Sequence, residues 1–69
     1  MTDLQQMALE QLHKFGPYAA ISYVAHRLQE RGILNDSTLT PFVYKALDFV
    51  DAFPKIRSTM ALNWIKQNT

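Results

Sequence analysis

The chain has 69 residues, no cysteine and a formal net charge of +1 at pH 7. Because cysteine is absent, disulfide bonds, thiolate metal sites and thiol catalysis are excluded, and the near-neutral charge indicates no particular class of partner. A hydrophobic fraction of 48% excludes disorder as the main state. We expect one domain, 1–69, close to the lower size limit for a self-supporting core. No signal-peptide pattern opens the sequence, so we expect a cytoplasmic protein without membrane spans.

The first predicted helix covers residues 3–15. Thr2 and Gln5 have the spacing of a capping box at its start. Apolar residues then recur at three- and four-residue intervals, namely Leu4, Met7, Ala8, Leu12 and Phe15. Gly16 suits the left-handed position that ends a helix, and Pro17 cannot continue the hydrogen-bond ladder.

The second predicted helix covers residues 17–31. Pro17 suits the first turn of a helix because its missing N–H has no partner there. One side of this helix carries Ala20, Ile21, Val24, Ala25 and Leu28. Gly32 ends the segment, and we expect Ile33 to pack back on Leu28, the contact that accompanies a Schellman motif.

The third predicted helix, residues 41–52, lies in the densest apolar segment of the sequence, PFVYKALDFVDAF. Its apolar residues fall on one helical face, namely Phe42, Ala46, Phe49, Val50 and Phe53. A helix with three phenylalanines in one stripe must be covered by other segments. We therefore predict that the third helix is central and that the other three pack on it.

The start of the third helix has two interpretations. Thr40 directly before Pro41 makes a cap and first-turn pair, which favours a start at residue 41. The preceding cluster of polar residues favours turns and caps. A start at Asp36 or Ser37, with Pro41 inside a bent first turn, therefore stays open.

The fourth predicted helix covers residues 55–66. Pro54 ends the third helix, since the residue before a proline is pushed away from helical dihedral angles. The apolar face of the fourth helix holds Ile56, Met60, Ala61, Trp64 and Ile65. Strand patterning is absent. The sequence thus predicts an all-α fold, a compact small bundle of four short helices.

No group of residues predicts catalysis or metal binding. Ser22, His26 and Glu30 lie four apart on one helix face, without the oxyanion donors and the water exclusion that a triad needs. Glu10 and His13 match one half-site of a carboxylate-bridged metal pair, and the second half-site is missing from the sequence. We therefore expect a protein that is not an enzyme, with no catalytic residue, no bound metal, no cofactor and no small-molecule substrate.

Nucleic-acid binding is the alternative function. Lys55, Arg57 and Lys66 form a tail without acidic residues, whereas residues 1–51 hold six acids and four bases. The succession of three helices resembles a helix-turn-helix core in its order. Its would-be recognition helix carries two aspartates against one lysine, which repels phosphate. Nucleic-acid binding is therefore disfavoured, and the basic tail is the better candidate for it.

Protein binding is the preferred hypothesis. Tyr23 and Arg27 on the second helix and Tyr44 on the third project away from the predicted core, and Trp64 belongs to the last helix. Tyrosine, tryptophan and arginine are over-represented at interface hot spots, although such residues also cover the edges of small bundles. We therefore predict a small regulator or inhibitor that docks on a protein partner or on a second copy as a homodimer. Its size alone also fits a phage protein.

Overall fold

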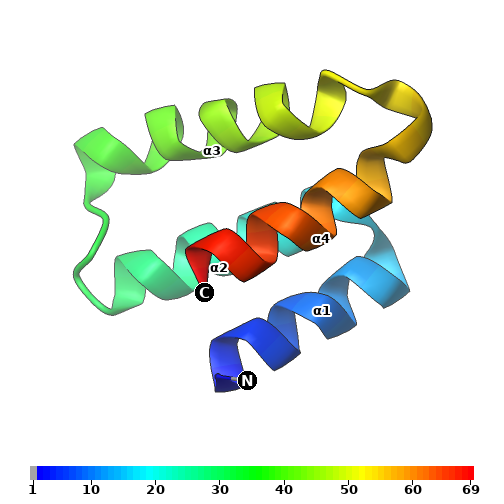
Figure 1. Ribbon diagram of the computed structural model, residues 1–69. Helices are drawn as coiled ribbons and strands as arrows, with labels where there is room; N and C mark the ends of the chain where they lie inside the picture. The colour runs from blue at the N-terminus through cyan, green and yellow to red at the C-terminus, as the bar shows by residue number, and fades with distance from the viewer. Residues whose placement is uncertain (1) are drawn as a thin grey trace.

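Four α-helices and one short 3-10 helix make up the protein over residues 2–69 (Figure 1). The computed structural model describes residues 2–69, and Met1 lies outside the described residues. The elements are α1 (Asp3–Phe15), α2 (Pro17–Glu30), α3 (Asp36–Asp51), η1 (Pro54–Ile56) and α4 (Arg57–Asn68). The predicted all-α bundle of four helices is confirmed, and no strand occurs within residues 2–69. Over the same residues, no helix is both long enough and apolar enough to cross a membrane.

The helix α2 packs against each of the other three helices. Figure 1 shows α1 and α3 on opposite sides of the molecule, with α4 in front of α2 between them. The two described chain ends lie side by side, where the Thr2 hydroxyl donates to the Thr69 carbonyl oxygen over 3.3 Å. The result is a bundle measuring 33 × 24 × 19 Å.

The core draws most heavily on α2. Among the described residues, twelve hydrophobic ones are buried, namely Leu4, Ala8, Ala20, Ile21, Val24, Ala25, Leu28, Ala46, Val50, Ala61, Trp64 and Ile65. Five of them belong to α2 and two to α3. The sequence predicted a central third helix, yet α2 supplies the larger share of the core. Full burial of a branched aliphatic side chain contributes about 1.5–3 kcal/mol.

The junction between α1 and α2 follows the sequence prediction. The Thr2 hydroxyl accepts a hydrogen bond from the Gln5 N–H over 3.0 Å, which satisfies one of the free donors at the start of α1. Gly16 has a φ of 99°, a conformation that an L side chain rarely adopts. Its N–H donates to the Leu12 carbonyl over 3.0 Å, and Pro17 opens α2 directly behind it.

A Schellman motif ends α2. Gly32 has a φ of 76° and donates its N–H to the Gln29 carbonyl, while the Ile33 N–H donates to the Leu28 carbonyl, both over 3.0 Å. These are the two bonds that define the motif. The predicted packing of Ile33 on Leu28 is wrong, because Ile33 is 66% exposed. Leu34 packs against the core instead.

The predicted start of the third helix at residue 41 is wrong and the alternative start at Asp36 is confirmed, because α3 begins at Asp36. The Asn35 side chain accepts hydrogen bonds from the N–H groups of Ser37 and Thr38 over 2.9 and 3.1 Å. In return, the Thr38 hydroxyl accepts from the Asn35 N–H over 2.8 Å. This reciprocal capping box starts the helix well before Thr40, which the sequence favoured as the cap.

Pro41 therefore lies inside α3. A proline within a helix lacks the N–H that would bond the carbonyl four residues earlier, and its ring crowds that carbonyl. The carbonyl belongs here to Ser37, an exposed residue that water can reach. The cap at Asn35 fixes the first turn ahead of the proline and contributes about 1 kcal/mol.

The connection from α3 to α4 is a tight corner. Phe53 has φ −129° and ψ 82°, outside the helical region, as expected for the residue before Pro54. The short helix η1 follows, and α4 begins at Arg57 and ends at Asn68. The predicted helix at 55–66 is thus displaced by two residues at each end.

Candidate protein-interaction surface

Three phenylalanines line one side of α3 and its C-terminal end. Phe42 is half-buried, Phe49 is 36% exposed and Phe53 is 55% exposed. The spacing of seven residues puts Phe42 and Phe49 on one side of α3, and Phe53 follows two residues after the helix ends. We call these three residues the phenylalanine stripe. The sequence predicted all three in the core. The prediction is wrong for Phe49 and Phe53, because the buried part of this face consists of Ala46 and Val50.

The stripe is anchored at one end and increasingly exposed toward the other. The Phe42 ring packs on the Trp64 ring of α4, with centroids 5.6 Å apart and planes tilted by 57°. Such aromatic pairs contribute about 0.5–1.5 kcal/mol beyond their burial. Phe53 has left the helix and turns outward ahead of Pro54, so the most exposed phenylalanine lies at the corner.

Two shallow hollows adjoin the stripe. The first, of about 260 Å³, is lined by Phe42, Lys45, Ala46, Phe49, Trp64, Gln67 and Asn68. The second, of about 450 Å³, is lined by Ala52, Phe53, Pro54, Lys55 and Ile56. Within residues 2–69, each hollow is lined by one lysine and by no acidic side chain. The first is smaller than usual small-molecule sites of roughly 300–1,000 Å³, and the second has walls from one short segment only.

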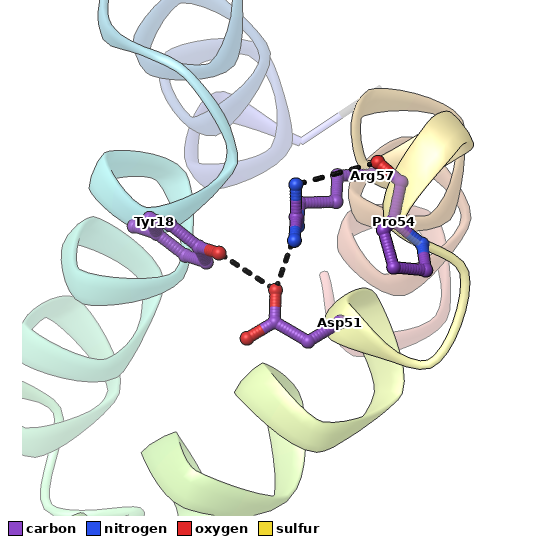
Figure 2. A network of polar contacts seen from close by, with 4 residues as sticks. All are labelled: Tyr18, Asp51, Pro54 and Arg57. Atoms are coloured by element: carbon purple, nitrogen blue, oxygen red, sulfur yellow. Dashed lines mark hydrogen bonds and ion pairs between the residues drawn. The ribbon is translucent and has the colours of Figure 1, made fainter.

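A polar network joins the corner to α2 (Figure 2). One oxygen of Asp51, at the end of α3, accepts from the Tyr18 hydroxyl over 2.6 Å and from the Arg57 Nε over 3.0 Å. Arg57 also donates through Nη1 to the Pro54 carbonyl over 3.3 Å. The network thus ties three helices together and holds the corner that presents Phe53.

The network shifts the pKa values of its two acids in opposite directions. The hydrogen bond from Tyr18 lowers the pKa of Asp51. Desolvation opposes this change, and the hydrogen bond and charge of Arg57 each lower the pKa by a smaller amount. The same hydrogen bond raises the pKa of Tyr18, because the phenol proton is shared with a carboxylate. Both side chains keep the protonation states that make the link at neutral pH.

The four residues predicted to bind a protein are not gathered in one place. Arg27 donates through Nη1 to the Tyr23 hydroxyl over 2.6 Å, and its Nε lies 3.5 Å from the Glu30 carboxylate, so both predicted residues of α2 are engaged within their own helix. Tyr44 is 64% exposed on α3. Trp64 is 6% exposed and belongs to the core, so its prediction as a surface contact does not fit the fold.

The three basic residues of the tail are spread along the chain. Lys55 lies in η1, and Arg57 is held by Asp51 over 3.0 Å. Lys66 lies nine residues beyond Arg57, roughly 13 Å along the helix axis. The structure therefore does not gather them into one phosphate-binding stripe.

The residues considered for catalysis or metal binding lie in the open. Ser22, His26 and Glu30 are exposed on α2. His13 is exposed too and borders a separate hollow beside Ser58. No group of three or more potential metal-ligating side chains lies close together in the described part of the chain.

Sequence reasoning missed the exposed corner from Phe53 to Ile56. The signal was available, because the residue before Pro54 leaves the helical region and so cannot stay on the buried face of α3. Ile56, predicted on the apolar face of the last helix, is 47% exposed, because it belongs to η1 and precedes the first residue of α4. Comparison of the chain with protein-family models, with curated proteins and with solved structures found no match.

Proposed function

We propose that this protein is a small non-enzymatic interaction module that docks on a protein partner through the phenylalanine stripe and the adjoining corner. The observation that carries the proposal is the exposure of Phe49 and Phe53, in a chain whose core fully buries the smaller side chains of Ile21, Val24, Val50 and Ile65. Large aromatic side chains left in water mark binding surfaces more often than smaller exposed residues do.

The exposed area has the size of an interface centre. A phenylalanine buries about 150–250 Å² when fully covered, so the exposed fractions of Phe49 and Phe53 leave on the order of 200 Å² open. Ile56 and Pro54 extend this area at the corner. Stable interfaces bury about 800 Å² per partner, with an apolar centre and a polar rim. The stripe would form that centre.

The rigidity of the surface also favours docking. The Tyr18–Asp51–Arg57 network holds the corner from one side, so little side-chain and backbone freedom remains to be lost on binding. A rigid apolar surface on a small domain suits a regulator or an inhibitor, and we place its action in the cytoplasm.

Affinity capture from cells that express the chain tests the proposal. We would compare the unaltered protein with a Phe49→Ser/Phe53→Ser double variant. Phe15→Ser is the matched control, because Phe15 is 70% exposed and belongs to α1, the helix that Figure 1 shows on the opposite side of the molecule from α3. Tyr44→Ala tests the outer side of α3 that the sequence favoured. Circular dichroism checks that every variant is folded.

We expect the unaltered protein and Phe15→Ser to capture the same partner and the double variant to lose it. Equal capture by the double variant would overturn the proposed surface. Loss of capture in Tyr44→Ala alone would move the interface to the outer side of α3. Absence of any specifically captured protein would overturn the proposed function.

A further inference from the structure

We infer that the partner presents an acidic amphipathic helix, whose apolar side chains cover the phenylalanine stripe and whose carboxylates reach Lys45 and Lys55. This inference rests on the proposed function and specifies its partner. It is carried by the chemistry of the two hollows, which combine aromatic and aliphatic walls with one lysine each.

The two lysines carry charge that the protein itself does not neutralise. Within residues 2–69, the ion pairs join Arg27 to Glu30 and Arg57 to Asp51, and both Lys45 and Lys55 are exposed. A partner with acids at matching positions gains complementarity at the rim. Such rim pairs set orientation and association rate more than affinity, and they repel a basic competitor.

The acid nearest the corner does not compete for these lysines. The Asp51 carboxylate oxygen that faces the network already accepts from Tyr18 and Arg57. Its charge is compensated by Arg57, whose Nε lies 3.0 Å away. Within residues 2–69, Asp48 beside Phe49 is a further exposed acid without an ion pair, so the positive charge is confined to the two hollows, each of which is lined by a lysine and by no acidic side chain.

The geometry of the surface favours a helix as the occupant. No sheet edge exists in the part of the chain that the structure describes, so strand addition is not available there. The stripe follows the side of α3 that faces α4, and a helix laid along it can place anchors at i, i+4 and i+7. Residues 45 to 51 alone rise about 9 Å along α3, so on a partner helix laid along α3 the two acids should lie at least about six residues apart.

Selection from a random 16-residue peptide display library against the immobilised protein tests this inference. We expect enriched peptides with apolar residues at helical spacing and acids on the flanks. Binding of the enriched peptides should disappear in Phe49→Ser/Phe53→Ser. In Lys45→Gln/Lys55→Gln it should weaken by roughly three- to tenfold, as for two exposed ion pairs. The control Lys14→Gln/Lys66→Gln makes the same change in net charge at two residues that line neither hollow, and it should bind as the unaltered protein does.

Several outcomes would overturn the inference while leaving the proposed function intact. These are enrichment of basic or uncharged peptides at the stripe, and equal weakening by the two lysine double variants. No enrichment, together with binding to vesicles of phosphatidylserine and phosphatidylcholine, would identify a lipid surface instead. Concentration-dependent dimers in light scattering that Phe49→Ser/Phe53→Ser abolishes would identify a second copy as the occupant. Peptides that bind regardless of the stripe would overturn both proposals.

Discussion

The helices α2 and α3 are similarly apolar in sequence but use their apolar residues differently. On α2 the large branched residues Ile21 and Val24 are fully buried, and the helix packs against all three others. On α3 the buried residues are Ala46 and Val50, while the larger Phe49 and Phe53 stay partly in water. The most hydrophobic segment of the sequence is thus not the most buried one.

The difference separates stability from recognition. The close packing of α1, α2 and α4 on one another needs small and branched side chains that fill the interior without voids. The phenylalanines of α3 lie at the edge of this interior, where Phe42 is anchored by Trp64. Side chains that contribute little to the stability of the fold are available to bind a partner. We therefore expect variants on α2 to change stability and variants in the phenylalanine stripe to change partner binding.

The largest expected effect is on α2. Ile21→Ala removes a fully buried side chain and should lower the free energy of unfolding by about 2–5 kcal/mol, from lost burial and the cavity left behind. Urea unfolding followed by circular dichroism measures this. In a domain this small the loss removes a large part of the total stability. If Ile21→Ala lowered the free energy of unfolding by less than Phe53→Ala does, the proposed difference between α2 and the phenylalanine stripe would be contradicted.

The start of α3 should come next in magnitude. Asn35→Ala removes both hydrogen bonds to the first turn and should cost about 1 kcal/mol. Thr40→Ala is the control, because the structure gives Thr40 no capping role, and it should change stability by less than about 0.5 kcal/mol. The same unfolding measurement applies. A larger loss of stability in Thr40→Ala than in Asn35→Ala would instead favour a helix that starts at residue 41.

How much the sequence could predict depends on whether a feature is local. The bounds of α1 and the end of α2 follow from Gly16, Pro17 and Gly32, which act through their own backbone. The start of α3 was mispredicted because two local signals compete, and the capping box at Asn35 outweighs the proline. The exposure of the phenylalanine stripe depends on how closely α3 approaches α2 and α4. Helical periodicity defines a face, but it does not say how deeply that face is buried.

Phe53→Ala should have a much smaller effect on stability than Ile21→Ala, about as small as that of Asn35→Ala. Phe53 is 55% exposed, and full burial of a phenylalanine contributes about 1.5–3 kcal/mol, so its partial burial should contribute about 1 kcal/mol or less. The unfolding midpoint should move little, while partner capture should fall. A loss comparable to that of Ile21→Ala would mean that the stripe belongs to the core, which would remove the main argument for a binding surface.

The smallest effect on stability is expected from the hydrogen bond between Tyr18 of α2 and Asp51 at the end of α3. The hydrogen bond to Asp51 raises the pKa of Tyr18 above 10.0. The stability that this bond contributes is therefore present below pH 10.0 and is lost as pH rises through the raised pKa. The pKa of Asp51 is lowered below 3.8, so its contribution is present above that pH and is lost as pH falls through the lowered value. The link should therefore persist across the neutral range and open at both extremes.

The variant Asp51→Asn tests this link directly, because it removes the charge that holds the proton on Tyr18. Phenolate absorbance during an alkaline titration should show Tyr18 ionising at lower pH in the variant than in the unaltered protein. Asp48→Asn is the control, since it removes an equal charge one turn away on the same helix. An unchanged titration in Asp51→Asn would mean that the bond does not form in solution, and the corner bearing Phe53 would then lack its tie to α2.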